Sequence, residues 1–191
     1  RTGLIDGAHR VAACLLFNKP VTCECFASRG GYDGTAMMLK NKKDFVRSGL
    51  SEKYLDDMAL TYATLKPSTF IITVFPAAVG KQAEIERILS TYGKIVYAKE
   101  IYINNGIGSV NFLRCLYDGE PFIGNFENDF HGARLKAPYC YPANNNRPTR
   151  IFLFEFDNQN EIRSCKDQLR NLFGIKHDSV HINDTHDETI R

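Results

Sequence analysis

The sequence FIITVF, residues 70–75, decides the fold that we expect for most of the chain. All its residues are β-branched or aromatic, and such residues favour strands because they pack well on a pleated surface. The run ends at Pro76, and a proline has no backbone N–H to donate to a neighbouring strand. Residues 70–75 are therefore predicted to form a strand.

Strands and helices alternate on the C-terminal side of this run. Residues 81–92 are amphipathic, with Ile85, Ile88 and Leu89 at the spacing of one helix face. The other elements expected here are a strand at 94–103, a helix at 108–117, an irregular part at 118–148, a strand at 150–156, a helix at 161–173 and a short strand at 179–182. The repeated order of strand, helix and strand is typical of a ferredoxin-like α+β sandwich.

A helix is also expected on the N-terminal side of the run. Ser51 offers an N-cap, and apolar residues follow at near-helical spacing as far as Leu65. Pro67 then ends the helix. We place a domain boundary at this point, which divides the chain into residues 1–66 and 67–191.

The sharpest local motif lies near the start, where Asp6-Gly7-Ala8-His9-Arg10 precedes an apolar helix. Gly7 allows a tight turn, and the next three residues fall in the first helical turn, whose backbone N–H groups have no partner inside the helix. These groups, the helix dipole and the side chains of His9 and Arg10 together attract an anion. The motif predicts a phosphate-binding loop, in which Asp6 orients the loop, binds Mg²⁺ or acts as a base.

This motif, with the alanine-containing helix and strand-like residues 21–26 after it, resembles the phosphate loop of the ParB/sulfiredoxin superfamily. That superfamily includes nucleotide-dependent enzymes, small-molecule kinases and nucleotide-switched DNA-partitioning proteins. The resemblance implies a partial ParB/sulfiredoxin-like module, in which Gly7 to Arg10 hold the phosphates of a nucleotide. Such a module needs strands before Arg1, and residues 186–191 resemble the start of a helix, so we expect a piece of a longer protein. A sulfiredoxin-like repair enzyme is not expected, since the motif has Ala8 where that reaction needs a cysteine.

A second set of residues occurs in a fixed order in the second half. The set consists of Pro76 after the first strand, Phe122 after a helix with Tyr117, Arg170 in the third helix, and His181 with Asp184 near the end. This order resembles the nucleoside diphosphate kinases. The resemblance implies a ferredoxin-like fold, with His181 as the phosphoryl-accepting histidine, Arg170 as a phosphate contact and Phe122 as the aromatic that stacks on a base. The chain departs from that family at Phe75, where the family has a lysine, and it has no clear counterpart of a second arginine that the family has shortly before the histidine.

His181 is open to several interpretations from the residues alone. It is a polar residue at a strand end, a neutral imidazole that acts as a nucleophile, or a charged imidazole that holds phosphate, tuned by a carboxylate such as Asp184. His177 and His186 lie nearby in sequence, but the spacing of the three histidines does not match a familiar pair of zinc ligands. No metal site is therefore assigned to them.

Residues 124–136 form another dense polar segment. Arg134 and Lys136 are candidates to bind the phosphate or carboxylate of a substrate, and Glu127 and Asp129 are candidates to position a hydroxyl group or Mg²⁺. The alternative is a solvated loop of mixed charge.

Composition limits the class of protein. The chain has 191 residues with 24 basic against 22 acidic side chains, so its net charge of +2 does not favour nucleic acid as a partner. Its six cysteines are scattered without a C-x-x-C pair and are expected to be free, buried thiols in a reducing compartment. No run of about 18 apolar residues predicts a membrane span, and no signal peptide is visible. These features indicate a cytoplasmic protein.

Both resemblances concern phosphate chemistry, and this agreement determines the functional hypothesis. We expect a nucleotide-dependent phosphotransferase that uses ATP or another nucleoside triphosphate with Mg²⁺. Its acceptor is expected to be a small hydroxyl-bearing metabolite, such as a sugar or an amino-acid-like alcohol. The alternative is a nucleotide-binding regulatory or DNA-associated module that phosphorylates no metabolite.

The phosphate loop gives a first testable prediction. Replacing Arg10 by alanine should weaken nucleotide binding by about 1.5–3 kcal/mol, because a charge-assisted hydrogen bond to phosphate is lost. Isothermal titration with ATP and Mg²⁺ measures the change. An affinity equal to that of the wild type would contradict the assignment of the loop.

Overall fold

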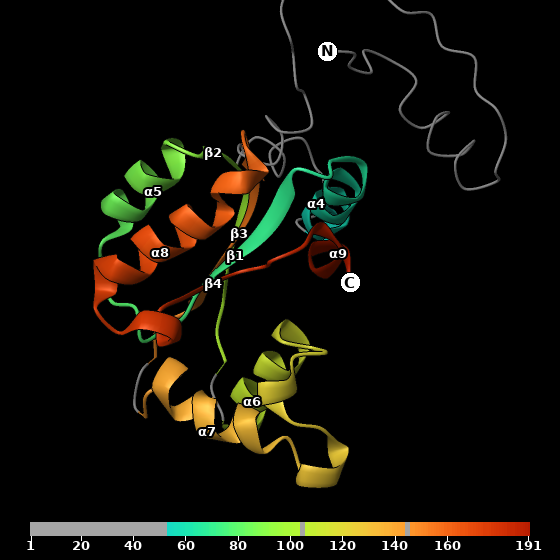
Figure 1. The fold of residues 1–191 in the computed structure, drawn as a ribbon, viewed down its shortest axis with the longest axis vertical. Coiled ribbons are helices and arrows are strands. Elements are labelled where there is room, and N and C mark those ends of the chain that lie inside the picture. Colours follow the sequence, from blue (N-terminus) through green and yellow to red (C-terminus); the bar gives the residue numbers. More distant parts are fainter. Residues whose placement is uncertain (1–52, 104–105, 144–145) are drawn as a thin grey trace, which may run out of the picture.

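The described residues, 53–103, 106–143 and 146–191 of a computed structural model, form a mixed helix and sheet fold of the α+β class (Figure 1). In chain order the helices and strands are α4 (Lys53–Leu65), β1 (Thr69–Val74), α5 (Gln82–Ser90), β2 (Gly93–Ile101), α6 (Gly106–Leu116), α7 (His131–Cys140), β3 (Thr149–Phe156), α8 (Ile162–Phe173), β4 (Val180–Ile182) and α9 (His186–Ile190). Single 3₁₀ turns lie at η1 (Pro121–Ile123), η2 (Phe126–Asn128), η3 (Gln159–Glu161) and η4 (Lys176–Asp178). The predicted phosphate loop, Asp6 to Arg10, lies outside the described residues.

The strands form one antiparallel sheet in the order β2-β3-β1-β4. β1, which includes residues 70–74 of the apolar run but not Phe75, pairs with β3 on one side and with β4 on the other. In the register, Phe70 lies opposite Phe154 and Thr73 lies opposite His181. The apolar run is therefore an inner strand, as its composition predicts.

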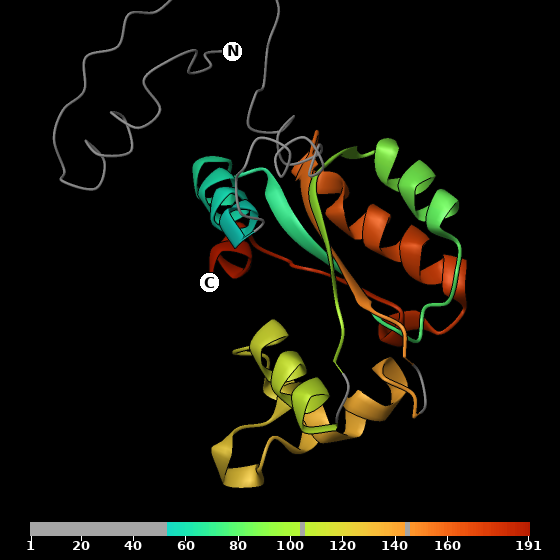
Figure 2. The same cartoon turned by 180° about the vertical axis from the view of Figure 1, so that it is seen from behind.

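Helices α5 and α8 lie side by side on one face of the sheet (Figures 1 and 2). Alternate residues of β1 and β3 point to this face, because side chains on a strand alternate with period two. They include Ile72 and Phe154, which pack in one core with Ile85 of α5 and Leu169 of α8, and each of the four is fully buried. This core holds the two helices against the sheet.

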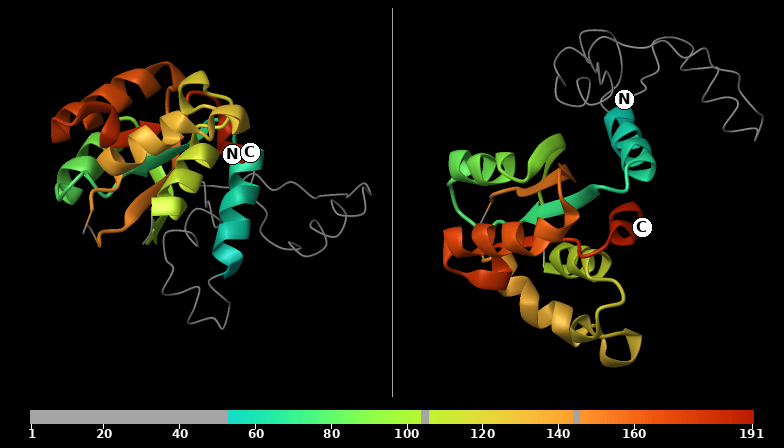
Figure 3. Two further views of the ribbon diagram at one scale, coloured as in Figure 1. Left: turned by 90° about the horizontal axis from the view of Figure 1, so that it is seen from below. Right: turned by 45° about the horizontal axis from the view of Figure 1, so that its top comes forward.

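Helix α4 packs on the opposite face, as two views of the fold show (Figure 3). Its Leu55 and Tyr62 share a second core with Val96 of β2 and Leu153 of β3. The helix predicted before Leu65 is thus confirmed, and it shares a core with the sheet that follows it. The boundary placed after residue 66 stays a prediction.

Helices α6 and α7 form a hairpin between β2 and β3, and the hairpin has a core of its own. Leu113 of α6 packs there with Ala133 and Ala137 of α7, and Phe75 at the end of β1 joins them. The hairpin extends from the end of the sheet where β2 finishes and β3 begins (Figure 1).

The prediction of an irregular part at 118–148 is wrong for residues 131–140, which form α7. The sequence hides this helix because Gly132 and Pro138 both disfavour a helix interior. Packing explains the glycine, since a Cβ at position 132 would lie 1.7 Å from the carbonyl oxygen of Phe122. The other predicted elements of residues 70–191 are confirmed, with ends that differ by up to two residues.

The cysteines agree with expectation in part. Cys140 and Cys165 are free and buried, whereas Cys115 is free but exposed. It occupies a solvent-facing position of α6, so its predicted burial is wrong. None of the helices in the described ranges is long and apolar enough to cross a membrane.

The core predicts a contrast between two leucines in helices. Leu169 is 0% exposed, whereas Leu65 is 68% exposed. Leu169→Ala should lower the free energy of unfolding by about 2–5 kcal/mol because it leaves a cavity. The matched variant Leu65→Ala should change it by less than about 0.5 kcal/mol. Chemical denaturation of both variants tests the prediction, and equal losses would contradict the described packing of α8.

Candidate functional site

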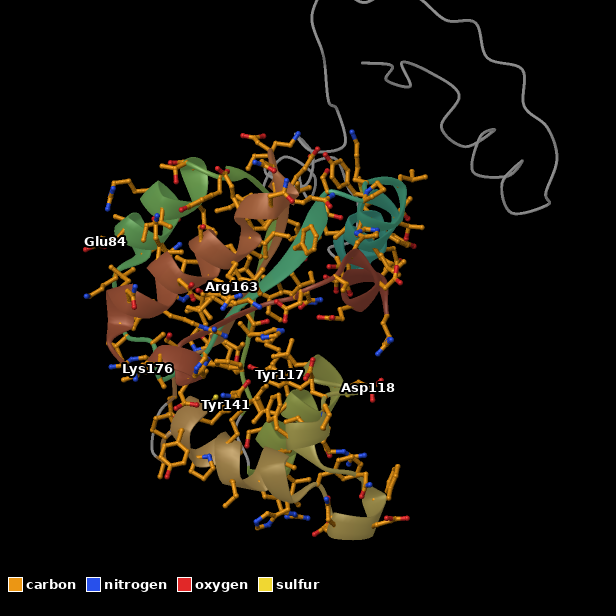
Figure 4. The ribbon with its side chains drawn as sticks, in the orientation of Figure 1. Glu84, Tyr117, Asp118, Tyr141, Arg163 and Lys176 are labelled. Atoms are coloured by element: carbon orange, nitrogen blue, oxygen red, sulfur yellow. The ribbon has the colours of Figure 1, made fainter. Side chains whose placement is uncertain are left out.

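His181 lies at the centre of a group of polar side chains between the sheet and the α6–α7 hairpin. Its neighbours Val180 and Ile182 belong to the core under α5 and α8, so strand alternation turns His181 to the other face. There the ring of Tyr117, just after α6, contacts it edge to face, with centroids 4.5 Å apart. Figure 4 shows Tyr117 on the side of the hairpin that faces the sheet. His181 is 6% exposed, and its Nε2 has no hydrogen-bond partner within the described part of the chain.

The surroundings of His181 keep its imidazole neutral. Burial lowers the pKa of His181 from 6.5 to about 3, with Lys166, Arg170 and Lys136 lowering it further and Asp184 opposing them. A protonated ring would lose its hydration and face three cations. Of the two chemical roles considered for this residue, the charged clamp does not fit this environment, whereas the neutral nucleophile does.

Two of the three cations come from α8. Lys166 and Arg170 are four residues apart and therefore lie on the same side of the helix. Lys166 is 7% exposed, and its ammonium group donates to a carboxylate oxygen of Asp184. Arg170 donates from Nε to the carbonyl oxygen of Val180 at 3.2 Å. No partner for the other two nitrogens of Arg170 is found among the described residues, so its fork is free to receive an anion.

The third cation comes from the hairpin. Lys136 Nζ donates to the Asp178 carboxylate and to the carbonyl oxygen of His177, both at 3.0 Å, and lies 5.7 Å from the centre of the Tyr117 ring. Cys140, one turn later in α7, points its Sγ at the same carboxylate, 3.9 Å away. Burial raises the pKa of Cys140 to about 12, so this thiol is protonated and is not a reactive nucleophile.

An aromatic pair connects this group to the surface. The ring of Phe122 packs edge to face on Tyr117, with centroids 5.2 Å apart, and Phe122 is 53% exposed. Burial raises the pKa of Tyr117 well above its ordinary value, so its hydroxyl stays protonated. The exposed ring of Phe122 is a surface on which a planar base or a sugar can stack.

Most of the described residues predicted for the site do lie together. His181, Arg170 and Asp184 form one group with Lys136, and Phe122 reaches it through Tyr117. Arg134 lies elsewhere, since its guanidinium pairs with Asp129 at 2.8 Å and is 54% exposed.

The predictions that concern Asp6, Gly7, Ala8, His9 and Arg10 lie outside the described residues. Within the ranges that the structure describes, no group of three or more His, Cys, Asp or Glu side chains could hold a metal ion.

Sequence reasoning missed four members of the group. They are Tyr117, Lys166, Asp178 and Cys140. Two signals pointed to some of them. Asp178, His181 and Asp184 recur every three residues, and Lys166 precedes Arg170 by the four residues that align side chains on a helix.

Comparison with known proteins adds no family or fold neighbour. No protein-family model matches the chain, and comparisons with curated proteins and with solved structures give no match. The functional argument therefore depends on the geometry of the site and on the resemblances in the sequence.

The neutral histidine predicts how stability depends on pH. The pKa of His181 is about 3 in the folded chain against an ordinary value of 6.5, so the unfolded chain binds the extra proton first. The stabilising effect of the neutral ring is complete above pH 6.5 and is lost as the pH falls toward 3.

Chemical denaturation across this range should show a smaller acid-induced loss for His181→Gln than for the wild type. His131→Gln, a control at an exposed position, should behave as the wild type. Identical pH dependence in all three proteins would contradict the low pKa.

Proposed function

We propose that the chain is a nucleotide-dependent phosphotransferase that acts on a small hydroxyl-bearing metabolite, with a phosphate-binding centre at His181. The observation that carries the proposal is a buried, neutral imidazole among three cations, with one nitrogen that has no partner among the described residues. Neutral imidazole is the nucleophilic form, and cations near it stabilise the charge of a phosphoryl group.

The fold supports the same proposal. The order of strands and helices from β1 to β4, with the sheet order β2-β3-β1-β4, fits a ferredoxin-like module. It puts His181 on a strand next to β1 and Phe122 on the hairpin inserted after β2. These residues, with Arg170, carried the resemblance to the nucleoside diphosphate kinases.

The structure gives a physical reason why this chain has Phe75 where the resembled family has a lysine. Phe75 is 1% exposed and belongs to the hairpin core, so it faces no ligand. Lys136 and Lys166 supply ammonium groups near His181 from α7 and α8 instead. Positive charge is therefore present although the lysine of the resembled family is absent.

The chemistry that fits these groups has two transfers. The imidazole attacks the terminal phosphorus of the nucleotide, a nitrogen–phosphorus bond forms, and the bond to the bridging oxygen of the leaving diphosphate breaks. The hydroxyl oxygen of the acceptor then attacks the same phosphorus, the nitrogen–phosphorus bond breaks with its electron pair returning to the imidazole nitrogen, and the hydroxyl proton passes to solvent. Arg170 holds the phosphoryl oxygens in both steps, and Mg²⁺ arrives with the nucleotide.

The loop from Asp6 to Arg10 belongs to the same proposal. It contributes a second set of phosphate contacts, while the group around His181 either holds a separate phosphate or receives the acceptor. Each set combines basic with acidic side chains, namely Arg10 with Asp6 in the loop and three cations with Asp178 and Asp184 around His181, which agrees with a net charge of only +2.

One observation favours a second candidate function, a nucleotide-binding regulatory module that transfers no phosphoryl group to a metabolite. His181 Nε2 is buried behind Tyr117, so a phosphorus atom does not reach it in this arrangement. In that case nucleotide binding changes the position of the hairpin and no chemistry follows.

Binding of ATP with Mg²⁺ tests the phosphate site. Arg170→Gln should weaken binding by about 1.5–3 kcal/mol, because a charged hydrogen bond to phosphate is lost. Arg163→Gln is the matched control, since Arg163 lies on the same helix, is exposed and carries the same charge (Figure 4). Equal losses in the two variants would attribute the effect to net charge and contradict the site.

Labelling with ATP that carries a radioactive γ-phosphate separates the two candidate functions. A phosphotransferase should become labelled on His181 with an acid-labile, alkali-stable bond, and His181→Asn should abolish the label without loss of ATP binding. ATP binding without any label would favour the regulatory module.

A further inference from the structure

Two more polar side chains lie beside His181 on the sheet, and each has an atom without a hydrogen-bond partner in the part of the chain that the structure describes. Thr73 of β1 is 0% exposed, and Asn183, just after β4, is 3% exposed. No hydrogen-bond partner is found for Thr73 Oγ1 or Asn183 Oδ1 within the described chain. Together with His181 Nε2 they make three buried, unpartnered polar atoms on neighbouring residues.

The register of the strands places the three residues in a row. Thr73 lies directly opposite His181 in the antiparallel pair of β1 and β4, and side chains in such a pair are about 5 Å apart at Cβ. The backbone N–H of Asn183 donates to the carbonyl oxygen of Ile71 at 3.2 Å, which continues the ladder by one residue. Asn183 is two residues after His181, so it shares the same face of the sheet.

This row is unusual for a protein interior. Buried polar atoms are nearly always paired, because an unpaired one loses its bonds to water and gains nothing in return. An arrangement of three adjacent exceptions is expected where a bound molecule or water supplies the missing partners. Tyr117 covers the middle of the row, since its ring lies on His181.

The chemistry of the row differs from that of the cations around it. Thr73 and Asn183 are neutral and offer both hydrogen-bond donors and acceptors, which is what a hydroxyl group requires. Arg170, which contacts the carbonyl oxygen of Val180 next to His181, offers a charged fork that suits a phosphate. The two kinds of group therefore match two parts of one ligand.

We propose that Thr73 and Asn183 form a hydroxyl-binding subsite beside His181 for a phosphorylated sugar, whose phosphate binds Arg170 and which enters when Tyr117 moves aside. This inference rests on the proposed function, because it takes the phosphate site as given. It adds the class of ligand and the residues that select it. Thr73 and Asn183 make no catalytic contact of their own and act by binding hydroxyl groups.

Titration calorimetry of the full chain with two probes, inorganic phosphate and ribose 5-phosphate, tests the subsite. The wild type should bind ribose 5-phosphate more tightly than phosphate. Thr73→Val has nearly the same shape but no hydroxyl, and it should weaken ribose 5-phosphate about 2–12-fold, as expected for one neutral hydrogen bond. Its affinity for phosphate should not change.

Matched variants keep the test independent of folding. Thr73→Ser retains the hydroxyl and should bind ribose 5-phosphate within about twofold of the wild type. Asn183→Leu removes the second polar group and should show the same selective loss as Thr73→Val. Thermal denaturation should find Thr73→Val at least as stable as the wild type, because an unpaired buried hydroxyl is removed.

The outcomes separate the subsite from the proposed function. Binding of phosphate with no preference for ribose 5-phosphate, or equal loss of both probes in Thr73→Val, would overturn the subsite and leave the phosphate site standing. Failure of the wild type to bind either probe would overturn both.

A third probe, AMP, identifies the source of the sugar. If the selective effect of Thr73→Val appears with AMP and disappears in Phe122→Ala, the subsite reads the ribose of a nucleotide. If Thr73→Val weakens ribose 5-phosphate equally in the wild-type and the Phe122→Ala backgrounds, the subsite binds a free sugar phosphate. Both results support recognition of sugar hydroxyls.

Discussion

The antiparallel pairing of β1 with both β3 and β4 is the constraint on which the rest of the structure depends. It makes β1 an inner strand with two covered faces. The face that holds Ile72 packs under α5 and α8. The face that holds Thr73 packs against α4 at Ile71 and meets Tyr117 at His181. Because alternate residues of one strand serve both faces, a shift of register by one residue would exchange the apolar core and the polar group.

The same alternation explains how a buried polar group persists next to a hydrophobic core. Val180 and Ile182 pack in that core and hold β4 in place. His181 lies between them, so its side chain must point to the opposite face of the sheet. Burial costs most for the charged ring, and this cost accounts for the low pKa of His181. Lys166 tolerates burial for a different reason, because its ammonium group forms an ion pair with the carboxylate of Asp184.

Much of the fold could be predicted from local patterns, but less of the site. Strands such as β1 and helices such as α5 follow from composition and periodicity, which are properties of short segments. Helix α7 was not predicted, because the need for a glycine at position 132 comes from the carbonyl oxygen of Phe122. This contact joins residues that are ten positions apart in the sequence. Arg170 and His181 could be anticipated from the order of motifs in the sequence, whereas the contact of Tyr117 with His181 arises from tertiary packing. Thr73 could not be distinguished from an ordinary strand threonine, since its lack of a partner is a property of the folded chain.

The attachment of the hairpin has a consequence for how such a chain can change over evolutionary time. Ile101, the last residue of β2, lies directly opposite Thr149, the first residue of β3. The two strands therefore meet at the point where the hairpin begins and ends, and a turn could join them without any shift in the sheet. Everything between them, including Tyr117 and Phe122, is an insertion into a scaffold that is already closed. Mutations can change the length and the exposed residues of that segment, but the packing of Phe75 in the hairpin core ties part of the stability of the scaffold to it.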